Sequence, residues 1–124
     1  MSIDRRILIA DDNGEIRSGL VELLSCPGFE IVEADSGTVA LQIVRRSRID
    51  LAVLDMHMPG LTGLELLGLF REEALSIPTI FCSAQASDDV LAMARHHGAR
   101  AVFKKPIEPR LLKSEVENIL GLAS

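Results

Sequence analysis

Several residue types and features are scarce or missing in this sequence, and each absence excludes something. There is no tryptophan or tyrosine, and no apolar run approaches the roughly 20 residues of a membrane-spanning helix, so we expect no membrane contact. The first residues are charged and lack the pattern of a secretory signal, which favours a cytoplasmic location. The two cysteines, Cys26 and Cys82, have no metal-site spacing and form no disulfide framework, so we interpret both as reduced core residues.

Positive charge is also in deficit. The chain has 13 basic and 18 acidic side chains, a net charge of −5, which argues against direct binding to nucleic acid. What it does have is 48% hydrophobic residues over 124 positions, enough for one domain with a substantial core. We expect a single domain over residues 1–124, with its core at about 5–122 and no second, output-type domain in this chain.

Short apolar runs alternate with stretches of helical spacing along the whole chain. Five such runs predict strands, at residues 6–10, 29–34, 51–54, 77–82 and 99–103. Each is followed by apolar residues at helical spacing, and Ser87 is expected to cap the helix after the fourth strand. This alternation with short connections requires a parallel sheet with helices on both faces. The fold class is therefore α/β, a single doubly wound domain with a five-stranded parallel sheet.

Acidic residues follow two of these strands directly. Asp11 and Asp12 come after the first strand, and Asp55 comes after the third, which reads as a central, buried strand. Because ligands bind at the carboxyl ends of parallel strands, we expect the three carboxylates to converge if these strands are neighbours. Their mutual repulsion would be relieved by Mg²⁺, which takes oxygen ligands, and the main-chain carbonyl of His57 could supply a further oxygen.

Two further strand ends complete a candidate pocket for a phosphoryl group. Ser83 follows the fourth strand and Lys105 follows the fifth. Aspartate can act as a nucleophile that forms acyl phosphates, while a cation and a lysine neutralise the transferred charge and a hydroxyl donates to an oxygen. Each residue alone is more typical of a turn, a helix cap or a solvated loop. Their joint placement at four strand ends indicates a site.

Five motifs carry a resemblance to a known family over nearly the whole chain. They are Ile7-Leu-Ile-Ala-Asp-Asp-Asn13, Asp55-Met-His-Met-Pro-Gly-Leu-Thr-Gly63, Phe81-Cys-Ser-Ala84, Gly98-Ala99 and Lys105-Pro106. The sequence resembles the receiver domain of bacterial two-component response regulators. The resemblance implies a flavodoxin-like sheet of strand order 2-1-3-4-5.

The resemblance also implies roles for the residues at the strand ends. Asp55 would be the phospho-acceptor, and Mg²⁺, or Mn²⁺ in its place, would be bound by Asp11, Asp12, Asp55 and the His57 main-chain carbonyl, with Asp11 acting through water. Ser83 and Lys105 would contact the phosphoryl group. The domain would catalyse only this transfer to itself and its own dephosphorylation, and would otherwise not be an enzyme.

The resemblance implies partners as well. The phosphoryl donor would be a sensor histidine kinase or a histidine phosphotransfer protein. The phosphorylated domain would act on a downstream protein target, or on an output domain absent from this chain. The chain itself is expected to be a monomer or a weak dimer.

One position departs from the family pattern. Family members commonly have Tyr or Phe three residues before the lysine, whereas this chain has Val102 there and Phe103 one residue later. In a strand a shift of one residue moves the side chain to the other face, so Phe103 is not expected to substitute. We hypothesise that the output depends on loop and helix shifts after Ser83.

Two side chains near the mouth of the site could set the lifetime of the phosphorylated state. They are His57, two residues beyond the acceptor, and Gln85, two residues beyond the serine. Histidine titrates near neutrality and could shield the phosphate or position water, although an exposed loop histidine without a role is an equal alternative. His96 and His97, beside Gly98, are interpreted as a pair at a helix C-terminus and not as metal ligands.

Two other functions remain open as alternatives. An aspartate-nucleophile phosphatase of the haloacid dehalogenase type requires Asp-x-Asp, but Asp55 is followed by Met56 and His57, which argues against it. The second alternative is a degenerate receiver that acts as an interaction module independently of phosphorylation. Retention of the acidic residues with Ser83 and Lys105 argues against this alternative, while Val102 keeps it open.

Overall fold

Strands and helices alternate strictly in the computed structural model, which describes residues 5–84 and 87–121. The strands are β1 (Arg5–Ala10), β2 (Phe29–Ala34), β3 (Leu51–Asp55), β4 (Thr79–Ser83) and β5 (Ala101–Lys104). The helices are α1 (Gly14–Leu24), α2 (Gly37–Arg46), α3 (Gly63–Glu72), α4 (Asp88–His96) and α5 (Pro109–Ile119). The predicted type and order of these elements are confirmed.

The strands form one parallel sheet in the order β2-β1-β3-β4-β5, as predicted. All five residues of β3 are buried, as expected for a strand covered on both faces. The edge strand β2 is less buried, with Glu30 and Glu33 exposed and only Ala34 fully buried. The carboxyl ends of β1, β3 and β4 consequently lie side by side at one edge of the sheet.

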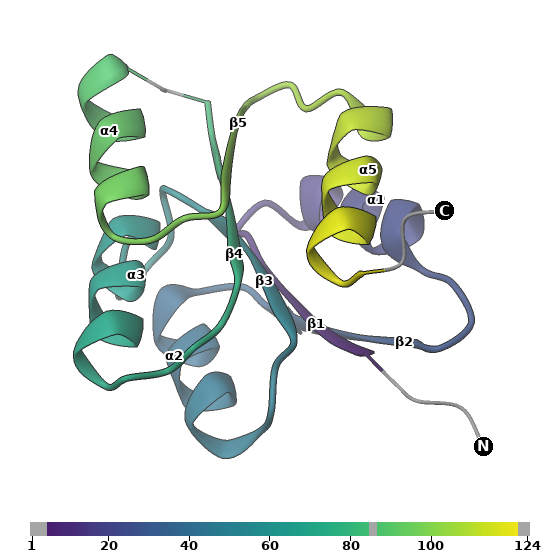
Figure 1. The fold of residues 1–124 in the computed structure, drawn as a ribbon, viewed down its shortest axis with the longest axis horizontal. Coiled ribbons are helices and arrows are strands. Elements are labelled where there is room, and N and C mark those ends of the chain that lie inside the picture. Colours follow the sequence, from purple (N-terminus) through teal and green to yellow (C-terminus); the bar gives the residue numbers. More distant parts are fainter. Residues whose placement is uncertain (1–4, 85–86, 122–124) are drawn as a thin grey trace.

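The core consists of two layers, one on each face of the sheet. Figure 1 shows α2, α3 and α4 on one face, and α1 and α5 on the other. Successive strand residues point to opposite faces, so Leu8 and Leu54 pack in the first layer while Ile7 and Val53 pack in the second. Within the described residues no helix is both long and apolar enough to span a membrane.

The helices begin where the sequence supplies a capping side chain. Asn13 accepts a hydrogen bond from the Ile16 amide, and Ser87 accepts one from the Val90 amide, as predicted for the fourth helix. Thr62 and Glu65 form a reciprocal capping box at the start of α3. These caps fix the helix starts directly after the loops that follow the strands.

Three local predictions differ from the structure. β4 begins at Thr79 instead of residue 77, because Pro78 lacks an N–H and contributes only its carbonyl, which accepts from Ala52. β5 begins at Ala101, because the preceding Ala99 amide donates back to the Ala94 carbonyl at the end of α4. Cys26 was expected in the core but is exposed, since it lies in the turn after α1, whereas Cys82 is buried as expected.

Candidate functional site

Three carboxylates converge where β1 and β3 end. Ala10 pairs with Leu54, so the next residues in register, Asp11 and Asp55, are neighbours across the sheet. One carboxylate oxygen from each of Asp11, Asp12 and Asp55 lies within 4.8 Å of the others. Asp11 and Asp55 are only 2% and 6% exposed, while Asp12 is exposed. The predicted convergence of these side chains is present.

Lys105 reaches into the same cluster. Its Nζ lies 2.8 Å from Asp11 Oδ2 and 2.8 Å from Asp55 Oδ1, so one ammonium group bridges two buried carboxylates. The backbone holds it there, because the Lys105 amide donates to the Ser83 carbonyl at 2.9 Å and extends the pairing of β4 with β5. The peptide bond between Lys105 and Pro106 is cis. Charge-assisted hydrogen bonds thus join Lys105, which follows β5, to Asp11 and Asp55, which lie far from it in the sequence.

Burial and charge compete at this site. Desolvation raises the pKa of the Asp55 carboxyl, and the nearby Asp11 charge raises it further, while the hydrogen bond from Lys105 lowers it and does not fully offset them. Burial lowers the pKa of Lys105, but its hydrogen bonds to Asp11 and Asp55 outweigh burial, and the net shift is upward. One ammonium therefore faces two buried carboxylates and the adjoining Asp12, which leaves an excess of negative charge.

This donor set fits a hard divalent cation. Carboxylate oxygens are the ligands that Mg²⁺ prefers, and a site with one open side allows it to keep several waters. The cluster of Asp11, Asp12 and Asp55 has both properties, because its oxygens converge and Asp12 is exposed while the other two are buried. These three side chains could hold a metal ion, with its charge opposing the excess of negative charge.

The loop after β3 is folded tightly against its surroundings by glycine. A Cβ at Gly63 would collide with the Asp55 carbonyl oxygen and lie 2.7 Å from Phe81 Cε1. Gly60 has a φ of +84°, and a Cβ there would collide with the Thr38 hydroxyl. The Gly63 amide donates to the Met56 carbonyl at 2.9 Å, which closes the loop directly behind Asp55.

The other predicted residues differ in their burial and in the face of the sheet on which they lie. Ser83 is the last residue of β4 and is fully buried, and His57 is exposed in the loop after β3. Gln85 lies outside the described residues. Val102 packs with the layer under α2, α3 and α4, whereas Phe103 packs with the layer under α1 and α5, so the two side chains lie on opposite faces of β5.

Sequence reasoning missed Arg17. Its Nη1 donates to the Asp11 carbonyl at 2.7 Å, and its Nε lies 3.0 Å from Glu33 Oε1 on β2. Arg17 therefore ties the backbone of Asp11 to the neighbouring strand. The available signal was an arginine one turn into α1, but its partner becomes evident only from the register that pairs Ile9 with Glu33.

Comparison with known proteins identifies relatives of this chain. The family model for the response regulator receiver domain matches residues 7–117. The chain is 38% identical over 109 residues to a response regulator receiver protein of Anaeromyxobacter sp. (strain Fw109-5), covering 87% of this chain and 46% of that protein. It is 35% identical over 117 residues to the chemotaxis protein CheY of Pseudomonas aeruginosa, covering 92% and 94% of the two chains.

A solved structure shows the same fold. The CheY-like receiver domain protein from Methanospirillum hungatei JF-1 superposes with a TM-score of 0.85 at 28% identity, covering 96% of both chains. The relatives differ in length, since this chain spans about half of the Anaeromyxobacter protein (46%) but nearly all of the Pseudomonas protein (94%).

Proposed function

Since the chain belongs to the response regulator receiver domain family, we propose that it is a phospho-accepting switch in two-component signalling. Asp55 accepts the phosphoryl group from a sensor histidine kinase or a histidine phosphotransfer protein, in a reaction that depends on Mg²⁺. The observation that carries the proposal is the single ammonium of Lys105 bridging Asp55 and Asp11, at 2.8 Å from each, beside the exposed Asp12. Few structural roles require that many charges at a buried sheet edge.

The chemistry of the transfer follows from these side chains. An Asp55 carboxylate oxygen attacks phosphorus, the bond between phosphorus and the donor's imidazole nitrogen breaks, and the imidazole keeps the electron pair. Before transfer, the Lys105 ammonium binds the attacking Asp55 carboxylate. After transfer it contacts one phosphoryl oxygen, while the Ser83 hydroxyl donates to a second phosphoryl oxygen. Asp11, Asp12 and Asp55 would hold the metal together with the His57 main-chain carbonyl, and its charge would stabilise the phosphoryl oxygens. His57 and Gln85 tune the attack of water on the product.

The donor must reach the mouth of the pocket, and a neighbouring groove is suited to receive it. A cavity of about 350 Å³ between α1 and α5 is lined mainly by apolar side chains and shares Lys105 with the site. Ile16, at its rim, is 37% exposed although it is a large aliphatic residue. We assign this groove to the histidine-bearing donor protein, because a partner seated there contacts Lys105, whose ammonium is bonded to Asp55.

The output is carried either by a separate target protein or by a further domain. The chain acts as the receiver unit over residues 1–124, as a monomer or weak dimer. The relatives are compatible with both arrangements, because one is about as long as this chain and another is about twice as long. The alternative of an interaction module independent of phosphorylation rests on Val102, which occupies the place of the usual aromatic ring.

The test is an intact-mass time course with acetyl phosphate. The wild-type chain is expected to gain one phosphoryl group with Mg²⁺ or Mn²⁺ and none with a chelator. Asp55→Asn is expected to gain none, whereas Asp89→Asn, an exposed aspartate on α4, should behave like the wild type. If the wild type gains no phosphoryl group and also binds no beryllium fluoride with Mg²⁺, the interaction-module alternative is the better account.

A further inference from the structure

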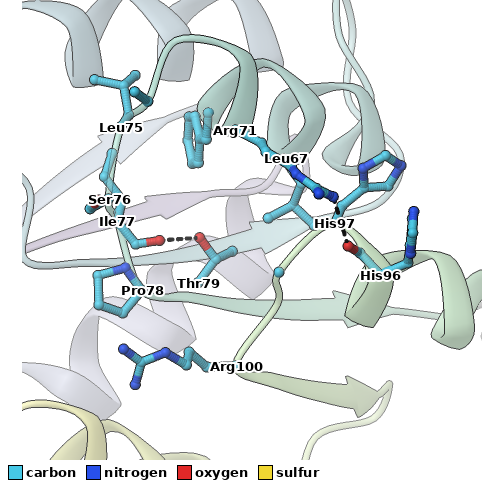
Figure 2. A pocket seen from close by; sticks show the side chains of 13 residues that line it. Leu67, Arg71, Leu75, Ser76, Ile77, Pro78, Thr79, His96, His97 and Arg100 are labelled. Atoms are coloured by element: carbon cyan, nitrogen blue, oxygen red, sulfur yellow. Dashed lines mark hydrogen bonds between the residues drawn. The ribbon is translucent and has the colours of Figure 1, made fainter.

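A second pocket lies at the end of the sheet opposite the acidic cluster. It has a volume of about 490 Å³ and lies between the C-terminal part of α3, the segment before β4, and the turn from α4 to β5. Figure 2 shows its lining side chains, with Pro78 and Thr79 at the start of β4. Because Thr79 begins the strand that Ser83 ends, this pocket is separated from the phosphorylation site by the length of β4.

The ionisable residues that line this pocket are all of the basic type. They are Arg71, His96, His97 and Arg100, and no aspartate or glutamate lines it, although the chain as a whole carries a net charge of −5. Among the described residues, neither Arg71 nor Arg100 forms an ion pair. Elsewhere in the described residues, Arg6, Arg17, Arg45 and Arg48 each pair with a carboxylate, whereas Arg5, Arg46, Arg95 and Arg110 form no ion pair. Two guanidinium groups therefore flank the cavity without an internal counter-charge.

Part of the pocket floor is apolar, and the hydroxyl and carbonyl of Thr79 already have hydrogen-bond partners. Leu67 and Phe70 are each 3% exposed and belong to the core layer under α3. The Thr79 hydroxyl donates to the Ile77 carbonyl at 3.0 Å, and the Arg100 amide donates to the Thr79 carbonyl at 2.8 Å. A ligand on this floor would meet carbon surface, and its polar contacts would come from the basic side chains at the rim.

The two guanidinium groups stand on different sides of the cavity. Figure 2 shows Arg71 extending toward His96 and His97, with its Nη1 donating to the His96 carbonyl at 3.2 Å. Arg100 lies beside Pro78 in the same view. The hydrogen bond to His96 uses one N–H of Arg71 and leaves its other donors for a ligand. The rim therefore offers a fixed donor at one side and a second cation at the other.

We propose that this pocket binds a small aromatic anion, such as an aromatic carboxylate or a nucleoside monophosphate. The anionic group pairs with the Arg71 guanidinium beside His97, and the ring lies on the floor toward Arg100. Arginine suits both the anionic group and the ring of such a ligand, since its planar guanidinium binds carboxylate and phosphate and its face stacks on aromatic rings. A volume of about 490 Å³ lies within the range of small-molecule sites, which is roughly 300–1,000 Å³.

The probe for the test is 8-anilinonaphthalene-1-sulfonate, an aromatic anion whose fluorescence rises on binding. Titration of the wild-type chain is expected to saturate, and amide resonances of Ser76, Gly98 and Arg100 should shift in a ¹⁵N spectrum. Guanosine monophosphate and benzoate should displace the probe at concentrations where inorganic phosphate does not. Shifts confined to Gly19 and its neighbours in the groove between α1 and α5 would overturn the proposal, as would equal displacement by inorganic phosphate.

Three variants locate the contacts. Arg71→Gln and Arg100→Gln should each weaken probe binding about tenfold or more, the usual cost of one charge-assisted contact. Arg95→Gln removes a positive charge from an exposed position of α4 outside the pocket lining and should leave binding unchanged. Arg100→Gln keeps the test valid if Arg71→Gln disturbs the fold, because the Arg100 side chain forms no ion pair or hydrogen bond among the described residues. Equal loss in all three variants would reduce the effect to net charge and refute the site.

Discussion

Removing the Lys105 ammonium tests whether the acidic cluster is held together by this one cation. In Lys105→Met the aliphatic stem can still pack, but Asp11 and Asp55 lose the shared donor that lies 2.8 Å from each. Two carboxylates that are 2% and 6% exposed then face each other and Asp12 without an internal counter-charge. We expect the variant to fold but to be less stable at pH 7.

The size of the loss can be worked from the burial of the pair. Removing one partner of a buried ion pair costs about 3–5 kcal/mol. The Lys105 side chain is 13% exposed, and the exposed Asp12 opens the cluster to water, so we discount the loss to about 2 kcal/mol. For a domain of this size that corresponds to a melting temperature about 8 °C lower.

The pH dependence follows from the direction of the pKa shifts. The pKa of Lys105 is raised in the folded chain by its bonds to Asp11 and Asp55, so its full contribution is present at pH 7 and is lost only at strongly alkaline pH. Burial and the Asp11 charge already raise the pKa of Asp55, and loss of Lys105 removes the interaction that lowers it. A raised carboxyl pKa means a penalty that is present above that pKa and relieved as the pH falls through it.

Thermal unfolding of the variant and the wild type at pH 7 and pH 5, with and without Mg²⁺, measures this effect. The deficit of Lys105→Met is expected to shrink at pH 5, and Mg²⁺ should stabilise the variant more than the wild type. Lys104→Met, at the exposed neighbouring position, should match the wild type in every condition. A deficit that is the same at both pH values, or no deficit at pH 7, would refute the electrostatic account.

Three further predictions follow from other parts of the structure. Gly63→Ala should lower the free energy of unfolding in urea by about 3 kcal/mol or more, because its Cβ meets the Asp55 carbonyl and Phe81, whereas Gly68→Ala, which meets nothing, should be neutral or slightly stabilising. Cys26 should react with a thiol reagent at pH 8 in the folded chain, while Cys82 should react only after unfolding, since burial raises its pKa to about 12. Arg17→Ala should weaken Mg²⁺ binding about threefold to tenfold in a calorimetric titration, because the Asp11 carbonyl loses its donor; an unchanged affinity would remove Arg17 from the site.

The edge of the sheet that carries the acidic cluster was predictable because local patterns determine it. The apolar run at 51–54 indicates a strand covered on both faces, and a parallel sheet brings the ends of such strands to one edge. Asp11, Asp55 and Lys105 could therefore be placed together before any contact was known. Register was not predictable, so the bond from Arg17 to the Asp11 carbonyl, which depends on where β2 places Glu33, was missed.

The basic pocket at the other end of the sheet could not be predicted from a comparable pattern in the sequence. Its lining comes from three segments between residues 67 and 100, and its two arginines are each preceded and followed by unremarkable helix or loop residues. The sequence analysis assigned no role to Arg71 or Arg100, and it interpreted His96 and His97 as a helix C-terminal pair, which is where they lie. Only the packing of α3 against the end of α4 makes them neighbours, as the bond from Arg71 to the His96 carbonyl shows.

The alternation of β5 constrains how the proposed switch can work. Val102 packs in the layer that contains Val90 and Ala94 of α4, while Phe103 packs in the layer under α1 and α5. For Phe103 to follow Ser83 toward a phosphoryl group, its ring would have to cross the sheet, which the backbone forbids without a change of register. This placement is in keeping with the hypothesis that the output depends on loop and helix shifts after Ser83, the last residue of β4. With Val102 in place of the aromatic residue, we expect phosphorylation to change the position of α4 and not the rotamer of a ring on β5.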